Sequence, residues 1–413
     1  MADRSANARD GRTWLAAAAA AAAALAISVG FGRFSYGLVL PAMEKSTLGS
    51  FGRASWLSSI NLGGYLIGVI LVTALAGRVP ATVLLRAGLA GTILGLVLLA
   101  ISPSFVPLAL AMAVAGISSG GVWVPVTGVV AEVAPPNRQG VALGITVAGV
   151  GIGLVASDVI VTLVGSHFGP QSWRADWGLE AVGGVMALAV TVTVIPAVHG
   201  TARAAERSWR SLRRLIDRRA VLLAYGAYGL GYVIYTTFLV AGLERSGRLA
   251  ASSAGAVFAL VGVTSALGGP ALGRLSDRVG RRPMLVAGQL TLALCSIVLP
   301  TPSLVLALAS AAVFGVLMSG VGATVVAHLS DNVEPHHVPG AFGVLTLALG
   351  AGQFVGPAFG GYLVDATGGF RATFAVAAGA FVVGAAAATR LRRSLPATEA
   401  PVAGRATVDP GED

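Results

Sequence analysis

The sequence predicts an all-α membrane protein with twelve transmembrane helices, arranged as two pseudo-symmetric six-helix bundles. Composition, the recurrence of long apolar runs and an internal repeat together lead to this fold class. Of the 413 residues, 55% are hydrophobic and only 11% are charged, and the mean hydropathy is +0.81. A soluble protein of this length needs far more charge to cover its surface. The lipid bilayer is therefore the expected surrounding.

Twelve apolar runs are long enough to cross the hydrocarbon layer of a membrane, which takes about 20 residues. The expected spans are residues 14–40, 54–76, 81–101, 104–130, 140–165, 177–196, 220–243, 253–272, 284–300, 303–327, 340–364 and 372–389. The first run follows three arginines and resembles a secretory signal peptide. It continues past its alanine-rich stretch to Leu40, however, which favours a retained span.

The longest polar stretch between spans divides the chain into halves of six helices. We expect an N-terminal bundle over residues 1–196, a basic cytoplasmic linker over 197–219 and a C-terminal bundle over 220–390. A cytoplasmic tail, expected to be disordered, takes residues 391–413. The linker is either an amphipathic helix on the membrane surface or a solvated segment.

Basic residues are distributed unequally between the two sets of loops. One set, which includes both termini, carries twenty arginines, and the other carries six basic residues. The positive-inside rule therefore predicts that both termini are cytoplasmic, in an inner (cytoplasmic) membrane. The net charge of +10 reflects this topology, and no nucleic-acid partner is expected. Cys295 is the only cysteine, which excludes internal disulfides and thiolate metal clusters.

The two halves resemble each other at corresponding helices, which supports a duplicated six-helix unit. A segment of the first span, GFGRFSY over residues 30–36, aligns with GLGYVIY over residues 229–235 in the seventh. In this alignment Arg33 falls opposite Tyr232. Glycines also recur at spacings of four residues, which lets helix backbones approach closely in lipid. These are Gly140 and Gly144, Gly149 and Gly153, and Gly352, Gly356 and Gly360.

The segment GRLSDRVGRRP, residues 273–283, is the most specific motif in the chain. Two glycines permit a tight reversal, Asp277 can cap a helix or pair with an arginine, and the arginines can contact helix C-termini. The motif resembles the cytoplasmic signature loop of the major facilitator superfamily (MFS). The resemblance implies an MFS fold and a conformational latch between the halves. Its residues here are Gly273, Arg274, Asp277, Arg278, Gly280, Arg281 and Arg282.

Other segments narrow the resemblance. GFGRFSYGLVLP in the first span and YGLGYVIYTTF in the seventh are similar to the YbfB/YjiJ subgroup of the MFS. The first-half copy of the signature loop is reduced to GRVP, residues 77–80. A glycine–proline motif like that of antiporters, residues 352–361, lies in the eleventh span instead of the fifth, which weakens any inference of drug antiport.

The resemblance implies a central cavity lined by the first, fourth, seventh and tenth helices. Arg33 and Tyr36 share one face of the first span, and tyrosines of the seventh recur at helical spacing. Trp123 on the fourth span and Gln353 on the eleventh add an aromatic face and a polar group. The candidate substrate-binding residues are Arg33, Tyr36, Trp123, Tyr228, Tyr232, Tyr235 and Gln353.

Asp158 is the only acidic residue that the predicted spans place well inside an apolar run. Counted at 1.5 Å per residue, Arg33 and Asp158 lie at similar depth. Three readings of Arg33 follow: it snorkels to the outer interface, it forms a structural pair with Asp158, or it binds an anionic or polar substrate. In the third reading Asp158 takes up and releases a proton.

These features predict a secondary active transporter of a small organic solute, working by alternating access, coupled to protons and with a slight lean to export. A transporter-like receptor without flux and an uptake symporter for an organic anion are the alternatives. No phosphate-binding loop or nucleophile–base pair is present, so we expect neither an enzyme nor a cofactor. His336 and His337 are adjacent and lack partners, so no metal site is expected. The expected protein is a monomer whose partners are lipid, a small solute and protons.

Overall fold

The computed structural model describes residues 2–135, 138–169, 171–198, 219–245, 249–300, 303–333 and 338–391. The predicted linker, residues 197–219, lies almost entirely outside the described residues, and so does the tail after residue 391. After a long first helix, the first half consists of α3 (Phe51–Leu75), α4 (Ala81–Ile101), α5 (Phe105–Val133), α6 (Gln139–Phe168) and α7 (Trp173–Val194). The second half consists of α9 (Arg219–Arg245), α10 (Ala251–Val279), α11 (Arg281–Val298), α12 (Leu304–Asn332), α13 (Val338–Thr367) and α14 (Arg371–Ala388).

Within the described residues, eleven helices are long and apolar enough to cross a membrane. The helix α11 fills the position of the remaining predicted span. It has 18 residues and begins with two arginines, which lowers its hydropathy. The all-α fold with repeated membrane spans is thus confirmed, with boundaries within a few residues of those expected for most helices.

The first span is longer and less regular than predicted. It begins as α1 (Ala2–Leu25), widens into a π-helical segment over Ala26–Phe34, returns to α-helix as α2 (Tyr36–Met43) and ends in a second π-helical segment over Glu44–Leu48. Pro41 lies inside α2 without ending the helix. A π-helical turn shifts the register of the side chains that follow it. The faces presented by this helix therefore differ from those of a regular α-helix.

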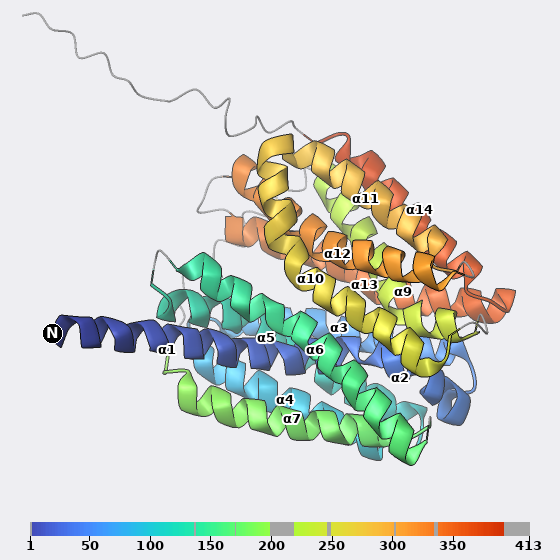
Figure 1. Ribbon diagram of the computed structural model, residues 1–413, viewed down its shortest axis with the longest axis horizontal. Helices are drawn as coiled ribbons and strands as arrows, with labels where there is room; N and C mark the ends of the chain where they lie inside the picture. The colour runs from blue at the N-terminus through green and yellow to red at the C-terminus, as the bar shows by residue number, and fades with distance from the viewer. Residues whose placement is uncertain are drawn as a thin grey trace, which may run out of the picture.

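The two halves meet through three helix pairs: α3 with α13, α6 with α10, and α2 with α9. Figure 1 shows the halves converging at the end where α2 lies and spreading apart toward the end where α1 begins. We call these the arginine-poor end and the arginine-rich end, after their loops. A Cβ at Gly255 or Gly361 would collide with the opposite half, whereas nothing lies within 4 Å of one at Gly144 or Gly269. The close packing between the halves is therefore at the arginine-poor end.

Polar contacts join the halves at the arginine-poor end. The Asp365 carboxylate on α13 accepts the Phe51 N–H over 3.0 Å and the Gly52 N–H over 2.8 Å. These are free backbone donors at the start of α3, where a negative charge is favourable. Arg245 on α9 also pairs with Glu44 over 3.4 Å.

The signature motif is more helical than the sequence predicts. Gly273 makes no turn: it lies inside α10, which continues to Val279, and the reversal is made by Gly280 alone, with φ of +99°. The Arg281–Asp277 ion pair, 2.6 Å long, links the last turn of α10 to the start of α11. Arg281 also contacts Asp331 on α12 over 3.0 Å. These contacts of the motif all lie within the second half.

Candidate substrate site between the two halves

Arg33 reaches from the first half to two residues of the second. Its Nη2 donates to the Gln353 Oε1 on α13 over 2.5 Å and to the Tyr232 hydroxyl on α9 over 3.3 Å. Gln353 Nε2 also donates to the Tyr232 hydroxyl. Gln353 is 1% exposed and Tyr232 is 7% exposed. A closed network of one charged and two neutral groups therefore spans the interface.

The guanidinium of Arg33 lies against aromatic rings and not against an acid. Its guanidinium carbon lies 4.5 Å from the centroid of Tyr65 and 5.4 Å from that of Phe34. Such contacts stabilise a cation by about 0.5–2 kcal/mol. Among the described residues no carboxylate lies within ion-pair distance of Arg33, and its Nε is buried without a hydrogen-bond partner. A partly buried cation with an unpartnered donor and no counter-charge is suited to an anionic ligand.

A small pocket lies beside Arg33 and is lined by both halves. Hydroxyl groups contribute to it from Ser58 on α3 and from Thr236 and Thr237 on α9. The Thr236 hydroxyl already donates to a carbonyl of its own helix. The pocket therefore combines one fixed positive charge with neutral acceptors. The free volume of the pocket is only about 10 Å³, room for one water molecule, so the site is closed to a solute in this conformation.

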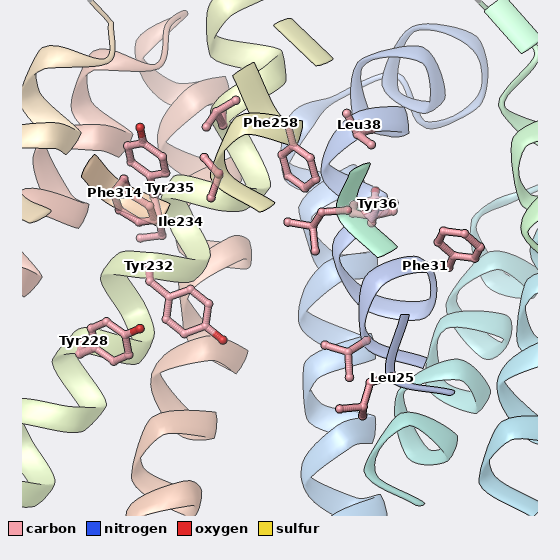
Figure 2. Close-up of a cluster of buried hydrophobic side chains, with 14 of the residues drawn as sticks. Leu25, Phe31, Tyr36, Leu38, Tyr228, Tyr232, Ile234, Tyr235, Phe258 and Phe314 are labelled. Atoms are coloured by element: carbon pink, nitrogen blue, oxygen red, sulfur yellow. The ribbon is translucent and has the colours of Figure 1, made fainter. Parts of the chain in front are cut away.

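The tyrosines of α9 do not act as one stripe. Figure 2 shows Tyr232 extending toward the first half, while Tyr235 lies on the other side, next to Phe314. Tyr235 stacks on Phe314 with ring centroids 3.5 Å apart and hydrogen-bonds Ser310. Tyr228 donates to the carbonyl of Met318. Only Tyr232 of the three contacts Arg33, and the other two hydroxyls bind within the second half.

Two further candidate substrate-binding residues, Tyr36 and Trp123, lie outside the Arg33 network. The Tyr36 hydroxyl donates to the carbonyl of Ala54 over 2.6 Å, so this tyrosine ties the first span to α3, although its side chain also borders the pocket. Trp123 on α5 is half-buried, and the structure gives it no contact with the Arg33 network.

Asp158 and Arg33 do not form the ion pair that one reading of the sequence suggested. The two residues do lie at similar depth, as the residue count predicted: their neighbours Ser157 and Ser35 are joined by a hydrogen bond of 2.6 Å. Asp158 Oδ1, however, lies against Gly255 on α10, while Arg33 faces α9 and α13. Depth along a helix follows from residue count, but the direction of a side chain depends on rotation and packing.

A buried acid was missed by the sequence reasoning. Glu180 on α7 is fully buried, and its Oε1 accepts the Ser35 hydroxyl over 2.5 Å and lies 2.7 Å from Ser157 Oγ. The predicted span began at residue 177, which placed Glu180 near a helix end. The helix begins four residues earlier, at Trp173, which places Glu180 two turns inside. Trp173 and Trp177, typical of a membrane interface, were the signal that the span starts earlier.

Comparison with known proteins agrees with this architecture. The model of a family described as "Uncharacterised MFS-type transporter YbfB" matches residues 25–389. The chain belongs to this family. It is therefore an MFS transporter by descent, as the resemblance of the signature motif and of the first and seventh spans implied.

Relatives that are named as tetracycline resistance proteins or as a multidrug transporter match only parts of this MFS protein. The uncharacterized MFS-type transporter YceJ of Bacillus subtilis is 24% identical over 364 residues, 86% of this chain and 91% of the relative. The class C tetracycline resistance protein of Escherichia coli is 31% identical over 113 residues, 27% of this chain and 28% of the relative. A bacterial homolog of the human lysosomal transporter Spinster, in an inward-facing and unoccupied conformation, superimposes with a TM-score of 0.75. It is 16% identical and covers 93% of this chain and 99% of its own, which shows the common fold.

Proposed function

We propose that this protein is a secondary active transporter that exports a small organic solute with an anionic group across the cytoplasmic membrane, by alternating access and at the expense of a proton gradient. The observation that carries the proposal is the guanidinium of Arg33. It is held between the halves by Tyr232 and Gln353 and has no carboxylate partner among the described residues.

The site is suited to alternating access because its groups come from different halves. A solute that binds Arg33 competes with Gln353 and Tyr232 for the same donors. Binding would therefore loosen one set of contacts between the halves while it supplies another. This differential effect on two conformations is what a ligand needs in order to drive a conformational change.

The ends of the molecule suit the two gates of such a cycle. At the arginine-poor end, which we assign to the outside on the positive-inside rule, Asp365 and the Glu44–Arg245 pair hold the halves together. The signature motif lies at the opposite end and bonds only within its own half among the described residues. A latch that is released on the cytoplasmic side is what an inward-facing state requires.

Export is favoured by partial relatives that are named as tetracycline resistance and multidrug proteins. Protons are the proposed coupling ion, because the described spans hold embedded carboxyl groups. The sequence points to Asp158, at the contact between α6 and α10, and the structure adds the fully buried Glu180 on α7, so these two carboxyl groups are the candidate carriers.

Reconstituted protein tests the proposal. Proteoliposomes carrying a pH gradient would be assayed with a panel of small carboxylates, with their neutral amides as matched probes and with tetracycline. We expect transport of at least one carboxylate and not of its amide, and loss of that transport in Arg33→Ala. Transport of no member of the panel, or equal transport by Arg33→Ala, would contradict the proposal.

A further inference from the structure

Glu180 lies at the centre of a buried hydrogen-bond cluster that the Arg33 site does not use. Its Oε1 receives the hydroxyl of Ser35 and contacts that of Ser157, and the two serine oxygens are 2.6 Å apart. Ser35 belongs to the first span, Ser157 to α6 and Glu180 to α7. Three helices therefore converge on one carboxyl group.

The second oxygen of this carboxyl group has no partner. Glu180 is 0% exposed, and its Oε2 makes no hydrogen bond. Within the described part of the chain, none of the ion pairs involves Glu180. An ionised carboxylate buried without a counter-charge costs several kcal/mol. In this conformation the neutral, protonated acid is therefore the favoured form.

The charged and titratable groups around Glu180 do not offer a counter-charge. Asp176 lies one turn earlier on α7, is 4% exposed and also has an unpartnered oxygen, so it adds a second acid. On the neighbouring helices, Arg33 points to the second half, Asp158 faces α10, and Arg86 on α4 binds carbonyls near the other end of α7. Two further groups are already bonded: Tyr36 to a carbonyl of α3 and His167 to a carbonyl of α6.

Ser35 connects this cluster to the substrate site. It closes the π-helical segment Ala26–Phe34, and its backbone N–H donates to the Gly30 carbonyl over 2.9 Å. Arg33 belongs to the same segment. π-Helical turns are frequently found at functional sites. A change of register here would move the Ser35 hydroxyl and the Arg33 guanidinium together.

We propose that Glu180 binds and releases the coupling proton, and that Ser35 transmits its protonation state to Arg33 through the π-helical segment. This inference rests on the proposed transport function. The three oxygens contact one another directly at 2.5–2.7 Å, which are hydrogen-bond distances. At these distances no metal cation fits among the three oxygens, whereas the unpartnered Oε2 of Glu180 is free to carry a proton.

The distance between the halves at the arginine-poor end gives a test that needs no solute. Spin labels would be attached through Lys45→Cys and Arg371→Cys, exposed positions on opposite halves, in the full chain with Cys295→Ser, in lipid nanodiscs. In the protein with an unaltered Glu180 cluster, we expect the distance between the two labels to change from short to long as the pH rises. Glu180→Gln, which resembles the protonated acid, should keep the short distance at every pH. Ser35→Ala should move the midpoint of the transition.

Asp158→Asn is the matched control, because it removes the neighbouring interface carboxyl and leaves the cluster intact. Its pH response should persist. A persistent response in Glu180→Gln, its loss in Asp158→Asn, or a response to Na⁺ at constant pH would overturn the proposal. If Glu180→Gln does not yield monodisperse protein, Ser35→Ala and Ser157→Ala test the proposal instead. If neither variant changes the midpoint of the pH-dependent distance change, the proton does not bind at this cluster.

The flux experiment and the distance experiment distinguish failure of the transport function from failure of the proton site. Carboxylate flux without a pH-dependent distance would leave the transport function standing and remove Glu180 as the proton site. A pH-dependent distance that Glu180→Gln abolishes, without flux of any solute in the panel, would retain the proton site and contradict the transport function.

Discussion

Arg33 and Gln353, 320 positions apart in the chain, are joined by a hydrogen bond of 2.5 Å across the interface between the halves. The amide oxygen of Gln353 is the neutral equivalent of the acceptor that an anionic solute would present. The contact thus holds the site closed without neutralising its charge. Predictions about substrate recognition follow from this relationship.

Gln353→Glu should weaken binding of any carboxylate that the protein transports. The new carboxylate would pair with Arg33 and occupy the charge that the solute needs. Hydrogen bonds to charged groups contribute about 1.5–3 kcal/mol, so affinity should fall by about tenfold or more. Titration of the purified variant with the carboxylate measures the effect. Gln353→Met, which adds no charge, should lose less affinity, and equal losses in the two variants would speak against an anion site.

Tyr232→Phe and Tyr235→Phe form a matched pair on one helix. Removal of the Tyr232 hydroxyl takes away a group that contacts both Arg33 and Gln353, whereas the Tyr235 hydroxyl bonds only Ser310. We expect Tyr232→Phe to lower the rate of solute flux several-fold and Tyr235→Phe to leave it nearly unchanged. Initial rates in proteoliposomes, normalised to the amount of protein, give the comparison. A larger loss of flux in Tyr235→Phe than in Tyr232→Phe would mean that the solute does not bind at Tyr232.

Asp365→Asn should shift the protein away from the conformation described here. The substitution removes the negative charge that caps the start of α3, an interaction of about 1 kcal/mol. The ratio of closed to open forms at the arginine-poor end should fall about fivefold. Spin-label distances between positions 45 and 371 report this ratio. Glu44→Gln should have a smaller effect, because the side chain of Arg245 in that pair is 61% exposed and such pairs contribute about 0–1 kcal/mol.

Gly149→Ala and Gly144→Ala should differ in stability, although both lie on α6 in predicted packing motifs. A Cβ at Gly149 would lie 2.0 Å from the carbonyl oxygen of Ala22, whereas nothing lies within 4 Å of one at Gly144. Overpacking of this kind costs about 1–3 kcal/mol. Thermal unfolding in detergent should show a lower midpoint for Gly149→Ala only. An equal decrease in both variants would mean that Gly144 also packs closely.

Several site features could be predicted from the sequence because they depend on position along a helix. The repeat placed Arg33 opposite Tyr232, and the two residues are in contact. The residue count placed Arg33 and Asp158 at one depth, and the Ser35–Ser157 contact agrees. Both inferences use only the rise per residue and the duplication.

Other features depended on where helices begin and which way they face. Glu180 seemed to lie near a helix end until α7 proved to start at Trp173. Gly273 was expected in a loop, but α10 continues through it to Val279. The glycines at 140 and 144 were expected to pack, but they lie where the halves diverge. Local sequence does not specify these outcomes, because each depends on a neighbouring helix.

The sequence alone determined that the chain crosses a membrane repeatedly, that its halves resemble each other and that an arginine interrupts the first apolar span. Hydropathy and residue spacing are properties of the chain in one dimension, and they are sufficient for these conclusions. Only the tertiary structure decided that Arg33 meets Gln353 and not Asp158, and that Glu180 is buried beside Ser35. The π-helical turn at residues 26–34 and the packing of α6 on α10 set the directions of these side chains, and direction is determined by contacts between helices.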